Sequence, residues 1–224
     1  MALCNPLYIQ YSTTPFDSNP AVVEKDPLVL ATLRWIRKSV VGLNLCPWAG
    51  GALTGGRLRV VVTPPNTEVS DYAAAALLEA HSLSALRGEA VRNATTLVIA
   101  RPPLVQDFRD FLDAAEIVDE MIDEEGLRGS VQLATFHPDY CFEGAKDGDA
   151  ENFTNRSPYP ILHLLLEDQV GAAVHQIKDP AKVWQRNVET TRKLGVEGMK
   201  ALLAECLDIN GVDSAELQNG DSPP

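Results

Sequence analysis

The residues best suited to chemistry lie in two neighbouring segments, F-H-P-D-Y-C-F-E-G at 136–144 and E-N-F-T-N-R-S-P-Y-P at 151–160. His137 can take up or release a proton, because an unperturbed imidazole titrates near neutral pH. Asp139 follows two residues later, so in extended backbone its carboxylate points the same way and could orient the ring. We therefore predict His137 and Asp139 as catalytic residues, with Tyr140 beside them as a substrate-binding residue. The structural alternative is a loop histidine that bonds only to backbone.

Ser157 followed by Pro158 indicates the start of a helix. The amino end of a helix attracts anions through its free N–H groups and its dipole. Arg156 adds a planar guanidinium that suits carboxylate or phosphate, and Asn155 adds an amide. The sequence thus predicts an anion-binding site formed by Asn155, Arg156 and Ser157, in which Arg156 does most of the work because Pro158 lacks an N–H. The structural alternative is a capped helix with Arg156 paired to a carboxylate.

Two further hypotheses concern sulfur and metals. Cys46, in the segment N-L-C-P-W, is a candidate nucleophile if a cation such as protonated His137 lowers its pKa, although such a cysteine is more often a small buried hydrophobe. His137, Asp139 and Cys141 alternate, with His163 as a fourth candidate ligand, but their spacing matches no common metal motif. A metalloprotein is therefore the weakest hypothesis, and no residue is assigned to a metal or a cofactor.

The common catalytic and nucleotide-binding motifs are absent from the sequence. It contains no G-x-G-x-x-G after a strand, no G-x-x-x-x-G-K-[ST], no G-x-S-x-G and no H-E-x-x-H. The glycine pairs at 50–51 and 55–56 precede a predicted strand instead of following one. A phosphate-cradling loop is therefore not expected.

The elements that must position these residues alternate along the chain. Asp26 followed by Pro27 indicates a helix start. Apolar periodicity predicts three helices and three strands, in the order helix 26–42, strand 58–63, helix 68–92, strand 96–100, helix 105–125, strand 131–136. Strands that alternate with helices predict an α/β fold with a small, mostly parallel sheet covered by helices. A split arrangement with an added antiparallel strand is the alternative.

Each predicted strand runs into proline, at Pro64, Pro102 and Pro138. If the strands are parallel, their exits lie along one edge, which is where open α/β sheets bind ligands. Arg101 and His137 precede two of these prolines. We therefore expect Arg101 to line a pocket that also contains His137.

After the third strand, a long loop leads to extra carboxyl-terminal helices, predicted at 158–174, 179–194 and 196–207. Loops of this length inside a compact domain are usually functional or disordered. His163 falls on the first of these helices, where it is equally a candidate substrate-binding residue or an ordinary helix-face residue.

Composition and charge limit the expected domain organisation, binding partners and cellular compartment. We expect an irregular arm at 1–25, one α/β domain at 26–207 and a disordered acidic tail at 208–224. A formal net charge of −12 argues against binding to nucleic acid or to anionic membranes. Four cysteines without a C-x-x-C pair fit a reducing compartment, and no apolar run approaches the length of a membrane span. We expect a cytoplasmic protein, and the oligomeric state is left open.

Three segments in order resemble an uncharacterised, mostly bacterial family, the domain of unknown function number 1415. They are W-I-R-K-S-V-V-G-L-N-L-C-P-W, Q-L-A-T-F-H-P-D-Y and E-N-F-T-N-R-S-P-Y-P-I-L-H-L-L. The resemblance covers about residues 28–195 and implies that the arm and the tail are additions. It implies no activity and carries no catalytic role to any residue.

The leading hypothesis is a small enzyme, a hydrolase or transferase that acts on an anionic small metabolite at the carboxyl edge of the sheet. Arg156 and Asn155 would hold the anion, His137 would transfer the proton, and Arg101 would line the pocket. The alternative is a ligand-binding or regulatory module that uses the same pocket without turnover.

Overall fold

A four-stranded sheet forms the centre of the molecule, which we describe from a computed structural model for residues 26–175 and 181–209. Its strand order is β1-β2-β4-β3. The strands are β1 (Leu58–Val62), β2 (Thr95–Ile99), β3 (Val131–Phe136) and β4 (Ile161–Leu166). The first three coincide with the strands that the sequence predicts, to within one residue at each end. The predicted arm at 1–25, most of the tail at 208–224 and the helix start at 179–180 lie outside the described residues.

The prediction of a mostly parallel sheet is wrong. β1 and β2 are parallel, but β4 is antiparallel to both β2 and β3. Because β4 opposes both of its neighbours, β1, β2 and β3 still run in one direction, as the alternating pattern predicts. The sheet is thus a mixed one, in which an unpredicted strand separates β3 from β2.

The predicted helix at 158–174 is also wrong in its first half. Residues 161–166 form β4, and only then does α5 (Glu167–His175) begin. The run I-L-H-L-L-L has good helix formers, but as a strand it pairs with β2 on one edge and with β3 on the other. Pro158 and Pro160 hold the residues before them extended, so the helix start predicted at Ser157 does not form.

The amino-terminal helix begins as predicted. Asp26 caps α1 (Pro27–Trp35) by accepting a hydrogen bond from Leu28 N at 2.8 Å. The helix continues as a π-helical segment, η2 (Ile36–Val41), and a short helix α2 (Ala49–Thr54) that the sequence does not predict follows it.

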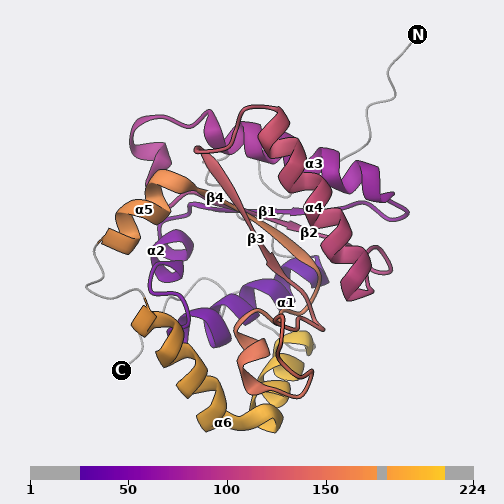
Figure 1. The fold of residues 1–224 in the computed structure, drawn as a ribbon, viewed down its shortest axis with the longest axis vertical. Coiled ribbons are helices and arrows are strands. Elements are labelled where there is room, and N and C mark those ends of the chain that lie inside the picture. Colours follow the sequence, from indigo (N-terminus) through magenta and orange to yellow (C-terminus); the bar gives the residue numbers. More distant parts are fainter. Residues whose placement is uncertain (1–25, 176–180, 210–224) are drawn as a thin grey trace.

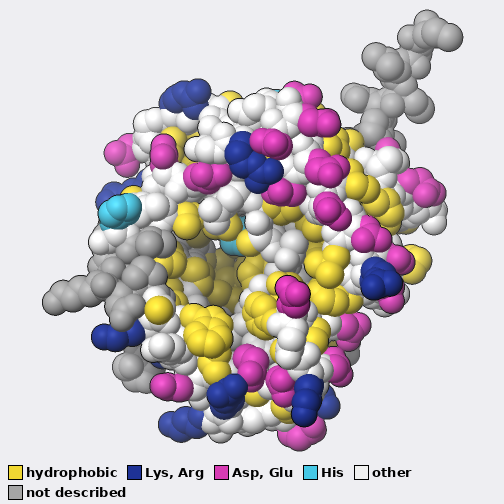
Figure 2. Space-filling view, in the orientation of Figure 1, with side chains coloured by type: hydrophobic (Ala, Val, Ile, Leu, Met, Phe, Trp, Pro, Cys, Tyr) yellow, Lys and Arg dark blue, Asp and Glu magenta, His cyan; other side chains and the backbone are white. Residues whose placement is uncertain are grey.

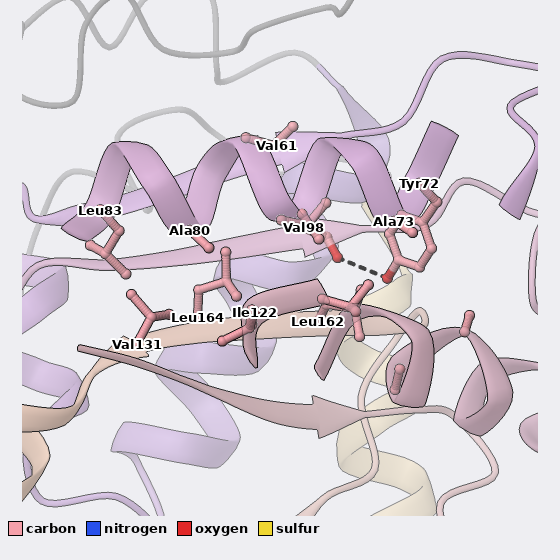
Figure 3. Packing of buried hydrophobic residues seen from close by; sticks show 14 of the residues in the cluster. Val61, Tyr72, Ala73, Ala80, Leu83, Val98, Ile122, Val131, Leu162 and Leu164 are labelled. Carbon is pink, nitrogen blue, oxygen red and sulfur yellow. Dashed lines mark hydrogen bonds between the residues drawn. The ribbon is translucent and has the colours of Figure 1, made fainter. Parts of the chain in front are cut away.

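One face of the sheet is covered by α3 (Val69–Ser84) and α4 (Phe108–Glu124). A short 3₁₀ turn, η3 (Gly88–Val91), occupies the end of what the sequence predicts as one long helix at 68–92. Figure 3 shows α3 side chains packed against Val98, Leu162 and Leu164 of the sheet, with Ile122 of α4 beside them. The buried Tyr72 hydroxyl donates to Val98 O at 3.1 Å, so its one polar atom is satisfied within the core.

The opposite face is covered by α1, η2 and α2 over β1 and β2, and by the long helix α6 (Ala181–Leu207) beyond α1. Side chains that point to this face from β1 and β2 are buried, namely Val60, Val62, Leu97 and Ile99. Of those that point the same way from β3 and β4, Ile161 is buried, and five are only partly buried, namely Gln132, Ala134, Phe136, His163 and Leu165. The cover on this face is therefore incomplete over β3 and β4.

The sequence predicts a break between two carboxyl-terminal helices at residue 195, and the structure confirms this position. Gly195 has non-helical angles, φ 71° and ψ 166°, inside α6. Among the described residues, no helix combines the length and the apolar character that crossing a membrane requires.

Candidate functional site

His137, the predicted proton-transfer residue, lies at the carboxyl edge of the sheet but has no exposed surface. The backbone N–H of Asp139 donates to Nδ1 at 3.0 Å, so this nitrogen carries no proton. Nε2 then carries the proton and donates to Val105 O at 3.2 Å. Both nitrogens are occupied by backbone, which is the structural alternative that the sequence left open.

The surroundings of His137 favour the neutral imidazole. The rings of Phe108 and Phe111 lie 5.2 and 5.1 Å from it. Burial lowers its pKa, and the Val105 carbonyl and the Asp139 carboxylate oppose this shift only in part. Val105 has φ 45°, a conformation that strains a β-branched residue. The hydrogen bond from Nε2 helps to hold Val105 in it.

The loop between β3 and β4 is closed at its neck by backbone hydrogen bonds. His137 N donates to Asn155 O at 3.2 Å, and Ser157 N donates to His137 O at 3.4 Å. Asn155 also donates from its side chain to Thr135 O at 3.2 Å, and the buried Ser157 hydroxyl donates to Tyr159 O at 2.6 Å. The predicted substrate-binding residues Asn155 and Ser157 thus continue the β3–β4 pairing.

Arg156 clamps the same loop from within. Its Nε donates to Tyr140 O at 3.1 Å, and its Nη2 donates to Asp147 at 3.0 Å (backbone) and 2.6 Å (carboxylate). The guanidinium lies 4.8 Å above the Phe153 ring. Most of its hydrogen-bonding capacity therefore orders the loop, and the helix dipole expected to assist it is absent because no helix begins at residue 158.

Arg101 lies at the carboxyl edge as expected, where it links three segments. It donates to Asp26 at 2.6 Å and to Thr63 O at 3.1 Å, and its backbone N donates to Thr63 Oγ1 at 2.8 Å. Burial raises the pKa of the half-buried Tyr159 hydroxyl, and the Asp26 carboxylate raises it further. Since Asp26 neutralises Arg101, this corner supplies little net charge for an anion.

The remaining predicted residues are scattered. Asp139 is exposed, and the ring of Tyr140 packs against Phe108 and Phe142. Cys46 lies partly buried in the turn before α2. Cys141 Sγ points to the carbonyls of Phe142 and Ala145 at 3.7 and 3.6 Å. In the described ranges, no group of three His, Cys, Asp or Glu side chains is placed to hold a metal ion.

His163 lies in the middle of β4, not on a helix, and its side chain is only partly buried. It pairs with Leu97 on one side and Ala134 on the other, and it points to the incompletely covered face. Thr95 Oγ1 lies 2.6 Å from His163 Nε2 and 2.8 Å from Leu164 O. The hydroxyl has one proton, which goes to the carbonyl because a carbonyl can only accept. His163 Nε2 is therefore protonated and donates to Thr95.

The other nitrogen of His163 is an unused acceptor. Nδ1 has no hydrogen-bond partner in the part of the chain that the structure describes, and it is not among the atoms there that are sealed from solvent without a partner. Burial lowers the pKa of His163 to about 4, so the ring is neutral near pH 7. Figure 2 shows a hollow lined by hydrophobic side chains, in the space that α2, α6 and β3 border in Figure 1.

The sequence patterns did not clearly predict the site around His163. The run around His163 is apolar at nearly every position, so it has neither the period of a strand nor a clear helical face. The residues that complete the site, Thr95 and Phe136, come from other strands, and the Phe136 ring lies 5.8 Å from the imidazole. The available signal was the third family-like segment, at 151–165, which contains His163.

Comparison with known proteins identifies the family of this chain but does not indicate an activity. No curated protein and no solved structure matches the chain. The family model described as "Protein of unknown function (DUF1415)" matches residues 28–201, which include all of α1 but its first residue, all four strands and most of α6. That match covers most of the chain, and this protein therefore belongs to the DUF1415 family.

Proposed function

We propose that this protein binds a small molecule on the open part of the sheet face, and that His163 accepts a hydrogen bond from it through Nδ1. The observation that carries the proposal is the asymmetry of the imidazole. Thr95 holds Nε2 at 2.6 Å, whereas Nδ1 has no partner within the described residues. Nδ1 is not among the sealed atoms, so a donor of a bound molecule can reach it and take the place of water there.

The surroundings of His163 define the kind of ligand. Its neighbours across the sheet are Leu97 and Ala134, and the Phe136 ring lies 5.8 Å away. These side chains offer apolar contact and no charge. They suit a molecule with an apolar body and one O–H or N–H donor, and apolar walls with a few convergent polar groups are typical of small-molecule sites.

Binding is better supported than proton transfer. A general base works best when its pKa lies near the operating pH. The pKa of His163 is lowered to about 4 by burial, which leaves a weak base at neutral pH. We therefore prefer a ligand-binding or regulatory role to the hydrolase or transferase hypothesis. The enzyme hypothesis needs a substrate that raises the pKa of His163 when it binds.

The anionic-metabolite hypothesis at the carboxyl edge has weaker support. His137 has both nitrogens bonded to backbone. Arg101 is paired with Asp26 at 2.6 Å, so that corner is close to neutral. The hypothesis now requires the loop that Arg156 clamps to open before a substrate can reach His137.

A pair of model ligands tests the proposal. Phenol carries an apolar ring and one hydroxyl donor, and anisole has the same ring with the donor removed by methylation. We expect phenol to bind about tenfold more tightly than anisole, since one hydrogen bond of about 1.4 kcal/mol is a factor of ten. Binding is measured by two-dimensional NMR titration, in which the resonances of His163 and Phe136 should move.

Matched variants show whether the imidazole is responsible. His163→Phe keeps a planar ring and removes Nδ1, so the preference for phenol should disappear. His81→Phe makes the same change at a histidine whose side chain is 44% exposed on α3, and it should leave the preference intact. Equal affinities for phenol and anisole in the unmodified protein would count against the proposal.

A further inference from the structure

The outer edge of β3 is the more accessible of the two edges of the sheet. β3 is the last strand in the order β1-β2-β4-β3, and Figure 1 shows α4 alongside it. At the other edge, Val60 and Val62 of β1 are only 4% and 1% exposed. In β3, by contrast, every residue after Val131 is partly exposed. A further strand can therefore reach β3 more readily than β1.

The backbone groups of β3 point alternately to β4 and to this outer edge. Ser130 O accepts a hydrogen bond from Glu167 N at 3.0 Å, so the even-numbered residues of β3 bond to β4. The odd-numbered residues point outward, as His137 N does when it donates to Asn155 O at 3.2 Å beyond the end of the strand. The outer edge thus carries the N–H and C=O groups of residues 131, 133 and 135.

The centre of this edge has no partner. At its start, Val131 N donates to Leu127 O at 3.0 Å. At its end, Thr135 O accepts from the side chain of Asn155, which follows the 3₁₀ turn η4 (Ala150–Thr154), at 3.2 Å. Between them, the N–H and C=O of Leu133 have no hydrogen-bond partner in the described ranges. A partner strand would find its donor and its acceptor at Leu133.

β3 also lacks the features that commonly protect an edge strand. Its sequence, V-Q-L-A-T-F, contains no proline and no charged residue. Its six residues pair with β4 in continuous register, so no bulge turns the edge away. Such an edge is a template for another strand, and several peptide-binding domains use one in this way.

One side of α4 lies beside this edge. Phe108, Asp119 and Asp123 recur at helical spacing and so share that side of the helix. The Phe108 ring contacts the Tyr140 ring, beyond the end of β3, at 5.2 Å. Arg128, before the start of β3, binds Asp119 and Asp123 at 3.0 and 3.4 Å. This side of α4 therefore borders β3 at both of its ends.

The charge around the edge favours a basic partner. Carboxylates lie beside it on α4 and in the loop after β3, namely Glu116, Asp119, Asp123 and Asp139. A second copy of the chain paired through β3 would place its α4 on the same face of the joined sheet, next to the first. Each copy carries a net charge of −12, so these acidic helices would repel each other. A segment rich in lysine or arginine meets attraction instead.

We propose that the outer edge of β3 binds an extended, basic segment of a partner protein, which adds a strand to the sheet. Its backbone accepts a hydrogen bond from Leu133 N–H and donates one to Leu133 O. Its apolar side chains contact Leu112, which is 42% exposed on the same side of α4, and its basic side chains pair with the α4 carboxylates. The edge takes no part in the hydrogen bonds of His163, so this proposal does not depend on the proposed function.

Two peptides of equal charge separate strand addition from simple attraction. The first is acetyl-Lys-Lys-Val-Thr-Val-Lys-Lys-amide, and the second is the same peptide methylated on the backbone nitrogens of Val-Thr-Val. Methylation removes the donors that a new strand needs, so we expect binding to weaken about tenfold or more. Two-dimensional NMR titration of the full chain measures both affinities. The amide resonances of Leu133 and Thr135 should move with the first peptide.

Matched variants test the role of charge. Asp119→Asn/Asp123→Asn should weaken binding of the first peptide by about threefold to tenfold, since two exposed attractions are lost. Glu197→Gln, at a carboxylate that is 89% exposed on α6, is the control and should have no effect. His163→Phe should bind the peptide as the unmodified protein does, even if the phenol preference fails.

The proposal is overturned if the first peptide does not bind at millimolar concentration, if the methylated peptide binds equally well, or if the shifted amides lie away from β3. Unchanged affinity in Asp119→Asn/Asp123→Asn would also overturn it. So would a dimer of the peptide-free protein, seen by sedimentation equilibrium, in which Leu133 N–H is protected from exchange, because a second copy would then occupy the edge. Shifts at Leu133 and Thr135 that methylation of the peptide abolishes would support it.

Discussion

Thr95 determines which nitrogen of His163 carries the proton. Its hydroxyl lies 2.6 Å from His163 Nε2 and 2.8 Å from the carbonyl of Leu164, and it can donate to only one of them. The imidazole therefore presents Nδ1, the nitrogen without a proton, to the open face of the sheet. In a binding site, an unprotonated Nδ1 can accept a hydrogen bond from a ligand, whereas in a closed core it would lack a partner. For this reason we place the proposed function at His163.

The hydroxyl of Thr95 can be removed with little change in shape. In Thr95→Val, the His163 Nε2–H loses its acceptor, and we expect a mixture of the two imidazole tautomers, with phenol binding weakened in proportion to the fraction that has a proton on Nδ1. Nitrogen-15 NMR of the side chain distinguishes protonated from unprotonated ring nitrogens directly. Thr95→Ser retains the hydroxyl and should retain a single tautomer. A single tautomer in Thr95→Val would show that Thr95 does not control the ring.

Stability should fall as the pH drops below about 6.5. An unfolded histidine takes up a proton near pH 6.5, whereas folded His163 does so only near pH 4. Between these values the unfolded state binds more protons, so the free energy of unfolding decreases with falling pH. The difference of 2.5 pKa units corresponds to a loss of about 3 kcal/mol by pH 4. Burial lowers the pKa of His137 too, which adds a loss in the same direction.

Urea denaturation at pH 7.5, 6 and 5 measures this effect. The decrease in unfolding free energy should be smaller in His163→Phe than in the unmodified protein, because that variant has one buried imidazole fewer to protonate. His81→Phe, at a partly exposed site, should follow the unmodified protein. Parallel pH profiles for all three proteins would refute the assignment of the loss to His163.

Arg156 should matter more to stability than an exposed arginine with equally good partners. Arg156→Lys cannot reproduce the fork that reaches both Tyr140 O and Asp147, and we expect a loss of about 2–4 kcal/mol. Arg128→Lys changes a guanidinium that binds Asp119 and Asp123 but is 49% exposed, so solvent screens its pairs and the loss should be much smaller. Chemical denaturation compares the two variants. Similar losses would mean that Arg156 does not clamp the loop.

Two glycines in α6 should respond in opposite ways to alanine. Gly195 has φ 71° and ψ 166°, a conformation nearly restricted to glycine, so Gly195→Ala should cost about 1–3 kcal/mol. Gly198 lies in the helix, and an added Cβ would meet Leu194 Cβ at an ordinary 3.5 Å. Gly198→Ala should therefore stabilise the protein by about 0.4–1 kcal/mol. Thermal melts suffice, and equal effects would indicate that the helix is continuous at Gly195.

The sequence predicted β1, β2 and β3 because each has a short apolar run between turn signals, and it predicted the α1 cap from Asp26 and Pro27. It failed at β4 because leucine-rich segments form helices or buried strands with equal ease. Only the pairing of residues 161–166 with two other strands settles that choice, and such pairing is not local in sequence.

The same distinction explains the candidate site. Local sequence was sufficient to single out His137, Asn155 and Arg156 as unusual polar residues in one loop, and these residues do lie together. Their hydrogen bonds, however, go to groups of that loop, of β3 and of the segment before α4, which no spacing reveals. His163 became a candidate only through Thr95 and Phe136, which its strand meets by pairing. By itself, the sequence determined which segments could be strands and helices, because local periodicity records which faces are apolar. Tertiary structure alone decided which polar groups are satisfied, because a hydrogen bond depends on partners that are distant in the chain.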